Sequence, residues 1–324
     1  MINIKDIKTV DGWRHATQNI NHITIQMYIS RLCNYSCPYC THRDNTEKYK
    51  TFDEYIQMMD DIYEQVKDKD LIDFSFFGGE PTIVPNFNKI IDHILSNYPN
   101  TYVTITSNGS QPLSWWKTLE KWKNRIHCFM SYQHNSTKNL NEFMEKMRWL
   151  YDQKYLYYLA VMLENEKEEE IKDVIKIFLE DPKLSKKLTY ASIDFNFNEK
   201  YREIESLFGN LNYKNVLNEQ EYALKVELTN DETIYFNDHM IFKTLNLHHF
   251  KYFKCLVGKE HILLDSNGDI YMCLSHILSD KKPLGNMFKD KSKIRELANS
   301  NGQICIFDEC VSELWIKKER IINI

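Results

Sequence analysis

The stretch "ITIQMYISRLCNYSCPYC", residues 23–40, joins a short apolar run to three closely spaced cysteines. The run is rich in β-branched residues, which predicts a β-strand. Cys33, Cys37 and Cys40 follow it in the spacing C-x3-C-x2-C. Three thiolates leave a tetrahedral zinc site one ligand short, so zinc would need His42 or a remote cysteine. They also hold three irons of a cubane [4Fe–4S] cluster and leave the fourth iron open to an exogenous ligand.

Strand-like and helix-like segments alternate over the first two thirds of the chain. The apolar runs predict strands over 23–29, 71–77, 101–107, 125–133, 156–163 and 190–197. Helical apolar spacing predicts helices over 52–66, 86–98, 113–122, 139–153 and 167–181. Such alternation is typical of a parallel sheet with helices packed outside it. Six units are fewer than the eight of a complete barrel, so we predict an α/β fold with a partial (β/α)6 TIM-like barrel, and a doubly wound sheet as the alternative. Both folds bind ligands at the C-terminal ends of the strands.

The last third of the chain has a different pattern. Residues 222–240 and 260–274 each predict a β-hairpin, with "NDET" and "SNGD" as the turns. Four cysteines fall in this β-rich region, namely Cys255, Cys273, Cys305 and Cys310. We therefore expect three parts: an N-terminal extension over 1–21, the barrel over 22–210, and a small metal-stapled module over 211–324.

Composition narrows the class of protein. The chain has 324 residues, is 43% hydrophobic and carries a formal net charge of −5, so no general basic field favours nucleic acid. No window approaches the apolar length of a membrane span, and the N-terminus shows no secretory apolar region. We expect a cytoplasmic protein, in which reduced thiolates bind metal more readily than they form disulfides.

A second motif ends the second predicted strand, in "FFGGEPT", residues 76–82. Gly78 and Gly79 allow the backbone to approach a ligand closely, because glycine has no Cβ atom. The carboxylate of Glu80 beside them suits an ammonium group. Without its context, the stretch would be read as an ordinary strand-to-helix turn.

These features together resemble the radical SAM superfamily. The resemblance rests on the cysteine spacing, Tyr39, the "GGEP" of residues 78–81 and the order of the β/α units over about 20–210. It implies that the three loop cysteines bind a [4Fe–4S] cluster, that S-adenosylmethionine (SAM) completes the fourth iron, and that Tyr39 lies near the adenine. It further implies a SAM-binding set made of Gly78, Gly79, Glu80, Pro81, Ser107, Asn108 and Ser131. Of these, Gly78, Gly79 and Glu80 would receive the methionine amino group.

The chemistry implied by the resemblance is reductive. One electron, from a reductant such as flavodoxin or ferredoxin, would cleave SAM to methionine and a 5′-deoxyadenosyl radical. That radical would remove a hydrogen atom from the substrate, while the protein supplies positioning and a dry cavity.

The C-terminal region resembles the SPASM and twitch extensions of radical SAM enzymes. The resemblance lies in the spacing from Cys255 through Gly268 to Cys273, followed by "PLGNMF" at 283–288. With Cys305 and Cys310, four thiolates would close an auxiliary [4Fe–4S] site. The C-x4-C spacing of the last pair is wider than the resemblance leads one to expect. Zinc held by the same four thiolates is the alternative.

The predicted function is that of an oxidoreductase-type radical SAM enzyme whose auxiliary cluster transfers electrons. We expect the substrate to be a peptide or protein side chain, with a small molecule such as a carbohydrate or nucleotide as the alternative. A non-catalytic zinc- or cluster-stapled binding protein is a further alternative, and "GGEP" argues against it.

Overall fold

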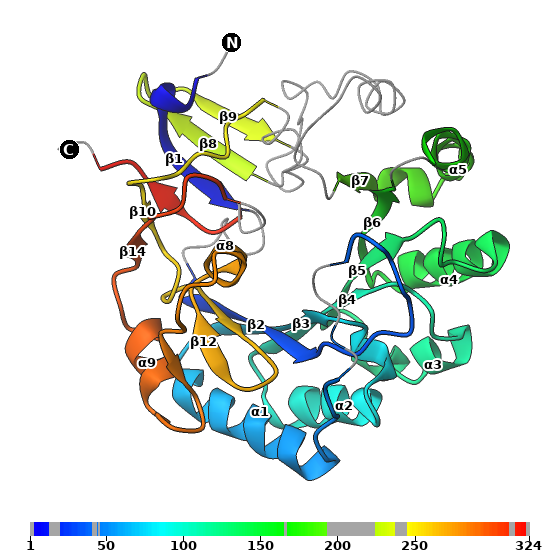
Figure 1. The fold of residues 1–324 in the computed structure, drawn as a ribbon, viewed down its shortest axis with the longest axis horizontal. Helices are drawn as coiled ribbons and strands as arrows, with labels where there is room; N and C mark the ends of the chain where they lie inside the picture. Colours follow the sequence, from blue (N-terminus) through cyan, green and yellow to red (C-terminus); the bar gives the residue numbers. More distant parts are fainter. Residues whose placement is uncertain are drawn as a thin grey trace. The chain divides into compact units, whose positions relative to one another are not determined.

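The computed structural model describes residues 3–12, 20–40, 44, 46–164, 167–192, 224–236, 245–310 and 315–321 (Figure 1). The chain divides into two compact units. The barrel unit comprises Met27–Asp61 and Asp73–Asn210, and the C-terminal unit comprises Met1–Gln26, Ile62–Ile72 and Leu211–Ile324. Within the described residues, no helix combines the length and apolar character needed to cross a membrane.

The sheet of the barrel unit has six strands in the order β2-β3-β4-β5-β6-β7, of which β2 and β3 begin in residues of the C-terminal unit. They are β2 (His22–Ser30), β3 (Leu71–Gly78), β4 (Thr101–Ser107), β5 (Ile126–Tyr132), β6 (Leu156–Leu163) and β7 (Leu188–Ser192). The pairs from β4 to β7 are parallel. The strands are buried along most of their length, as expected where both faces of a parallel sheet are covered. No pairing closes β7 onto β2 among the described residues, so the barrel is partial.

A helix follows each of the first five strands of this sheet. The helices are α1 (Phe52–Val66), α2 (Phe87–Asn97), α3 (Leu113–Lys117), α4 (Leu140–Asp152) and α5 (Glu168–Glu180), with short 3-10 turns η3 (Pro81–Ile83), η4 (Glu120–Trp122) and η5 (Leu184–Lys186). Helix α5 shows why they pack as they do. It buries Ile171, Val174, Ile175 and Phe178, which share one face at helical spacing.

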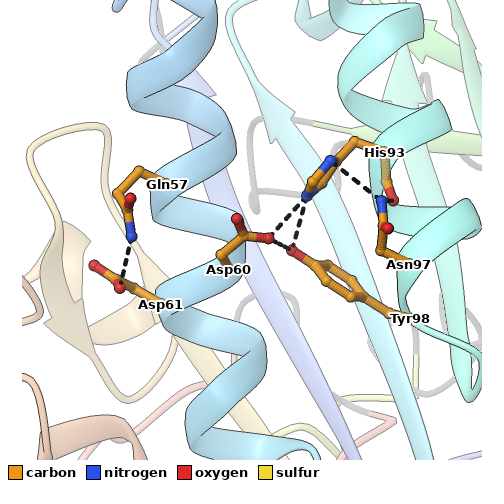
Figure 2. Close-up of polar contacts among 6 residues, drawn as sticks. All are labelled: Gln57, Asp60, Asp61, His93, Asn97 and Tyr98. Carbon is orange, nitrogen blue, oxygen red and sulfur yellow. Dashed lines mark hydrogen bonds and ion pairs between the residues drawn. The ribbon is translucent and has the colours of Figure 1, made fainter.

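Polar side chains tie α1 to α2 at the surface (Figure 2). The Nε2 atom of His93 lies 2.8 Å from Oδ1 of Asp60, which also accepts a hydrogen bond from the Tyr98 hydroxyl. Asn97 Nδ2 donates to the His93 carbonyl oxygen at 2.8 Å. Because the side chains of His93 and Asp60 are both partly exposed, we expect their contact to contribute no more than about 1 kcal/mol.

The C-terminal unit contains a sheet with the strand order β14-β10-β15-β1-β8-β9. Its strands are β1 (Ile7–Gly12), β8 (Leu224–Leu228), β9 (Thr233–Phe236), β10 (Lys254–Cys255), β14 (Gln303–Ile304) and β15 (Lys318–Glu319). β1 pairs antiparallel with both β8 and β15, so the N-terminal segment lies inside this sheet. The apolar core beneath it includes Ile7, Val10, Val226, Phe236 and Phe250.

A second group of strands in this unit, in the order β13-β12-β11, lies next to the first half of β2. It comprises β11 (His261–Leu264), β12 (Asp269–Tyr271) and β13 (Gly285–Asn286), with α8 (Leu274–Leu278), α9 (Lys293–Ala298) and the N-terminal 3-10 turn η1 (Ile4–Asp6) elsewhere in the unit. β11 and β12 form the predicted hairpin, and Gly268 in its turn has φ +80°, which favours glycine.

The fold prediction is confirmed as an α/β fold with a partial barrel of parallel strands. The hairpin predicted over 222–240 is β8 paired with β9. The sixth strand begins two residues earlier than predicted, at Leu188, and residues 193–197 lie outside the described residues. The boundaries at 21 and 210 stay predictions.

Candidate cluster and SAM site

The three cysteines of the first motif lie on the loop that leaves β2, and all three are free and partly exposed. The loop is tightly turned, since Cys40 N donates to the Cys37 carbonyl oxygen at 3.1 Å. The backbone N–H of Tyr35 also points at the Cys33 sulfur, 3.4 Å away. The loop therefore presents three thiols from one short segment at the end of a strand.

The two glycines that end β3 lie directly against the start of this loop. A Cβ atom on Gly79 would stand 2.0 Å from the Leu32 carbonyl oxygen, and one on Gly78 would stand 2.5 Å from that of Ser30. Hydrogen bonds fix the contact, from Gly79 N to Ser30 O at 3.0 Å and from Glu80 N to Leu32 O at 2.9 Å. The close approach that the sequence predicted is thus made to the protein's own backbone, immediately before Cys33.

Glu80 is buried, with 1% of its surface exposed, and its carboxylate accepts four hydrogen bonds. Oε1 accepts from Thr82 N at 3.1 Å, from the Thr82 hydroxyl at 2.6 Å and from the Ser107 hydroxyl at 2.8 Å. Oε2 accepts from Asn108 N at 2.7 Å. Burial raises the pKa of Glu80, and the four donors oppose that shift by favouring the ionised form. The side chain therefore links the end of β3 to the end of β4.

Asn108 carries this connection on to the cysteine loop. Its Nδ2 donates to Asn34 Oδ1 at 3.1 Å and lies 3.9 Å from the Cys33 sulfur. Next along the sheet, the Ser131 hydroxyl donates to the Ser107 carbonyl oxygen at 3.4 Å. The ends of β2, β3, β4 and β5 thus meet in one polar network that contains most of the predicted residues.

Three further residues lie near the same strand ends. Tyr39 was predicted from the sequence, whereas Ser136 and Glu164 were not. The Tyr39 hydroxyl is buried, and burial raises its pKa, with smaller contributions from Cys37 and from Glu164. Ser136, after β5, brings its hydroxyl 3.6 Å from the Cys37 sulfur. Glu164 directly follows β6 and is 3% exposed. The signal that marks both is a polar residue just beyond the end of a predicted strand.

A cavity of about 540 Å³ opens beside the cysteine loop. Its lining is polar and apolar in about equal parts and comes from the cysteine loop, from the segments after β4 and β5, and from the first turns of α4. Representative residues are Asn34, Tyr35, Ser110, Thr137, Glu142 and Lys146. Lys146 donates to the Gly109 carbonyl oxygen at 2.7 Å, and burial lowers the pKa of its ammonium group.

The four cysteines of the C-terminal unit surround a second, small pocket of about 30 Å³. Cys255 lies in β10, and Cys273 directly precedes α8. Cys305 and Cys310 come from the segment after β14, and none of the four cysteines is in a disulfide. Burial raises the pKa of Cys305. The structure therefore brings together four thiols that are spread over 56 positions of the sequence.

A zinc ion and an iron–sulfur cluster need different arrangements of cysteine sulfurs. With Zn–S bonds of about 2.3 Å, a tetrahedral zinc site places its sulfurs about 3.8 Å apart. All eight cysteines lie in the described part of the chain, and no three of their sulfurs lie within 4.8 Å of one another. Three thiols on one loop and four thiols in one pocket are ligand sets that a [4Fe–4S] cluster could use, and the set of four could also hold zinc. His42, the alternative zinc ligand, lies outside the described residues.

Comparison with known families bears directly on the first set. Residues 27–178 match the sequence model of the radical SAM superfamily, and this segment includes the end of β2, the cysteine loop, "GGEP" and strands β3 to β6. This segment is a radical SAM domain. Members of the superfamily are enzymes that use a [4Fe–4S] cluster and SAM, and the protein is therefore an enzyme. The predicted family is confirmed.

Solved structures show the same fold beyond the radical SAM domain. The structure of native anSMEcpe with bound AdoMet and Kp18Cys peptide has a TM-score of 0.58 at 16% identity, covering 86% of this chain and 81% of that one. Native anSMEcpe with bound AdoMet alone gives 0.56 at 17% identity, with 86% and 81% covered. At these identities the similarity shows the fold alone. No curated protein matches the sequence.

Proposed function

We propose that Cys33, Cys37 and Cys40 hold the [4Fe–4S] cluster of the radical SAM domain and leave its fourth iron for SAM. The observation that carries this proposal is the loop itself, which presents three thiols at the strand end where Gly79 and Asn108 also lie. When bound, the cluster and SAM supply a 5′-deoxyadenosyl radical that abstracts hydrogen from the substrate.

The polar network around this loop suggests separate roles for the residues of "GGEP". The carboxylate of Glu80 already accepts four protein donors, so we assign it to holding the strand ends in place. The backbone at Gly78 and Gly79 offers carbonyl oxygens to the methionine amino group. Pro81 begins η3 and keeps the chain turning away from the site.

Other polar groups at the strand ends complete the proposed SAM site. We place Tyr39 against the adenine, and Ser107, Asn108 and Ser131 beside the ribose and the methionine carboxylate. The support is that Tyr39 lies on the cysteine loop, and that the other three lie at strand ends whose hydrogen bonds reach the start of that loop.

In the C-terminal unit, Cys255, Cys273, Cys305 and Cys310 would hold an auxiliary [4Fe–4S] cluster. The support is that all four thiols line one pocket. Four protein ligands leave no open iron, which suits electron transfer more than substrate binding.

We further propose that the substrate is a peptide or protein side chain. The support is the similarity in fold to a structure that contains a bound peptide. Flavodoxin or ferredoxin would be a suitable reductant, and the seven proposed cysteine ligands, which must stay reduced, favour the cytoplasm.

Anaerobic reconstitution tests the proposal. The wild-type protein should bind about eight irons per chain, two cubanes' worth, and release 5′-deoxyadenosine when reduced. Replacing Cys33, Cys37 and Cys40 with alanine should abolish that release and leave about four irons. Cys128→Ala is the matched control, because this cysteine is buried in β5 and belongs to neither set, so the variant should retain all the iron. Bound zinc without SAM cleavage would overturn the proposal.

The substrate class needs its own measurement. A cysteine-containing peptide should accelerate 5′-deoxyadenosine formation and lose two hydrogen atoms, as detected by mass spectrometry. If such peptides change neither quantity while a carbohydrate or nucleotide does, the peptide proposal is wrong and the small-molecule alternative replaces it.

A further inference from the structure

A lysine shares the pocket of the four C-terminal thiols. Lys318 lies in β15, which pairs antiparallel with β10 so that Lys318 is directly opposite Cys255. Residues that face each other in this way project their side chains from the same side of a sheet. Accordingly, Lys318 lines the same pocket as the four cysteines and is only 1% exposed.

Two uncharged groups help to hold the Lys318 ammonium group in place. Nζ donates to the Ile316 carbonyl oxygen at 2.8 Å and lies 5.1 Å from the centre of the Phe250 ring. A buried cation is costly unless charge nearby compensates for it.

The other charged residue that lines the pocket is Glu309, whose side chain is 48% exposed. Water therefore screens the Glu309 charge far more than that of the buried lysine. Four thiolates around a [4Fe–4S]²⁺ core carry a net charge of −2, which becomes −3 when the cluster takes up an electron. A buried positive charge stabilises the more negative, reduced form more strongly.

We propose that Lys318 raises the reduction potential of the auxiliary cluster and so makes it an electron acceptor. This inference rests on the proposed function, because it requires a cluster on the four C-terminal cysteines. Net charge and burial are among the properties by which a protein sets the potential of an iron–sulfur cluster. Lys318 acts through its charge on the cluster and does not need to touch the substrate.

The test uses the Cys33→Ala, Cys37→Ala, Cys40→Ala protein, in which the auxiliary cluster would be the remaining one. Its midpoint potential is measured by redox titration with electron paramagnetic resonance of the reduced cluster. Lys318→Met keeps the chain length and removes the charge, so it should shift the potential to a more negative value. Lys318→Arg keeps the charge and should stay close to the parent. Lys317→Met is the matched control, because Lys317 is partly exposed and pairs with Glu319 at 3.0 Å.

Each outcome of this titration either supports or overturns the role proposed for Lys318. A more negative potential in Lys318→Met alone supports the proposal, as does loss of iron in Lys318→Met with full iron in Lys318→Arg. An unchanged potential in Lys318→Met, or an equal shift in Lys317→Met, overturns it while leaving the auxiliary cluster established. If the parent triple variant binds no iron at the four C-terminal cysteines, the auxiliary cluster itself is refuted, and the role of Lys318 with it.

Discussion

Glu80→Gln tests whether the buried carboxylate holds the strand ends together. In the wild-type structure, both carboxylate oxygens face donors only: three donors at Oε1 and the Asn108 N–H at Oε2. Glutamine replaces one oxygen with an NH₂ group. The least disruptive placement keeps the oxygen toward Thr82 and Ser107 and turns the NH₂ group toward the Asn108 N–H.

That placement loses one hydrogen bond to a charged acceptor, a contribution of about 1.5–3 kcal/mol. It also leaves two donors facing each other in a buried site. Taking about 2 kcal/mol for local opening of this region, the amide of Asn108 should exchange with solvent about 30-fold faster. Amide hydrogen exchange followed by mass spectrometry, on peptides that cover residues 105–112, measures this directly.

The control is Glu169→Gln, the same chemical change at a side chain that is 84% exposed and paired with Lys172. It should leave exchange unchanged, since exposed ion pairs contribute little. An unchanged exchange rate at Asn108 in Glu80→Gln would refute the prediction that the Glu80 carboxylate holds this amide. That result would mean that Glu80 is protonated in the folded protein, so that glutamine could replace it without loss.

Two further predictions concern other parts of the chain. Gly79→Ala should lower the free energy of unfolding by about 3 kcal/mol and lower the melting temperature, because its Cβ would stand 2.0 Å from the Leu32 carbonyl oxygen. The control is Gly285→Ala, whose Cβ would meet only the flexible Lys293 side chain at 3.1 Å. Equal melting temperatures for the two variants would contradict this prediction. Burial, with a smaller contribution from Glu260, raises the pKa of Asp11 from 3.8 to about 6. The folded state therefore binds this proton more tightly than the unfolded state, and stability falls as the pH rises from about 4 through 6. Asp11→Asn should lessen that fall in thermal denaturation, and identical pH profiles would count against it.

Much of the barrel unit could be predicted from its sequence. The helix bounds Phe52–Val66 and the strand bounds Thr101–Ser107 agree with the predicted ranges, because long elements carry their apolar periodicity in the sequence itself. The strands of the C-terminal unit were harder to predict from the sequence. Strands of two residues such as β10, β14 and β15 show no periodicity, and they form only because the sheet supplies their partners.

The residues of the candidate site likewise divide into those that the sequence predicted and those that it did not. The cysteine loop and "GGEP" could be recognised because each is a continuous motif. Ser136 could not be tied to Cys37, because the two are 99 positions apart and only the neighbouring strand ends bring them together. Glu80 was predicted to face an ammonium group, whereas in the structure its carboxylate accepts four hydrogen bonds from Thr82, Ser107 and Asn108.

The sequence by itself determined the three-thiol loop, the alternation of strands and helices, and the residues available as ligands, since these depend on spacing along a continuous stretch. Only the tertiary structure decided that β1 joins the C-terminal sheet, that Ser136 lies beside Cys37, and that Lys318 lies opposite Cys255. The physical reason is that such contacts depend on long-range pairing and burial, which the spacing of residues in the sequence does not encode.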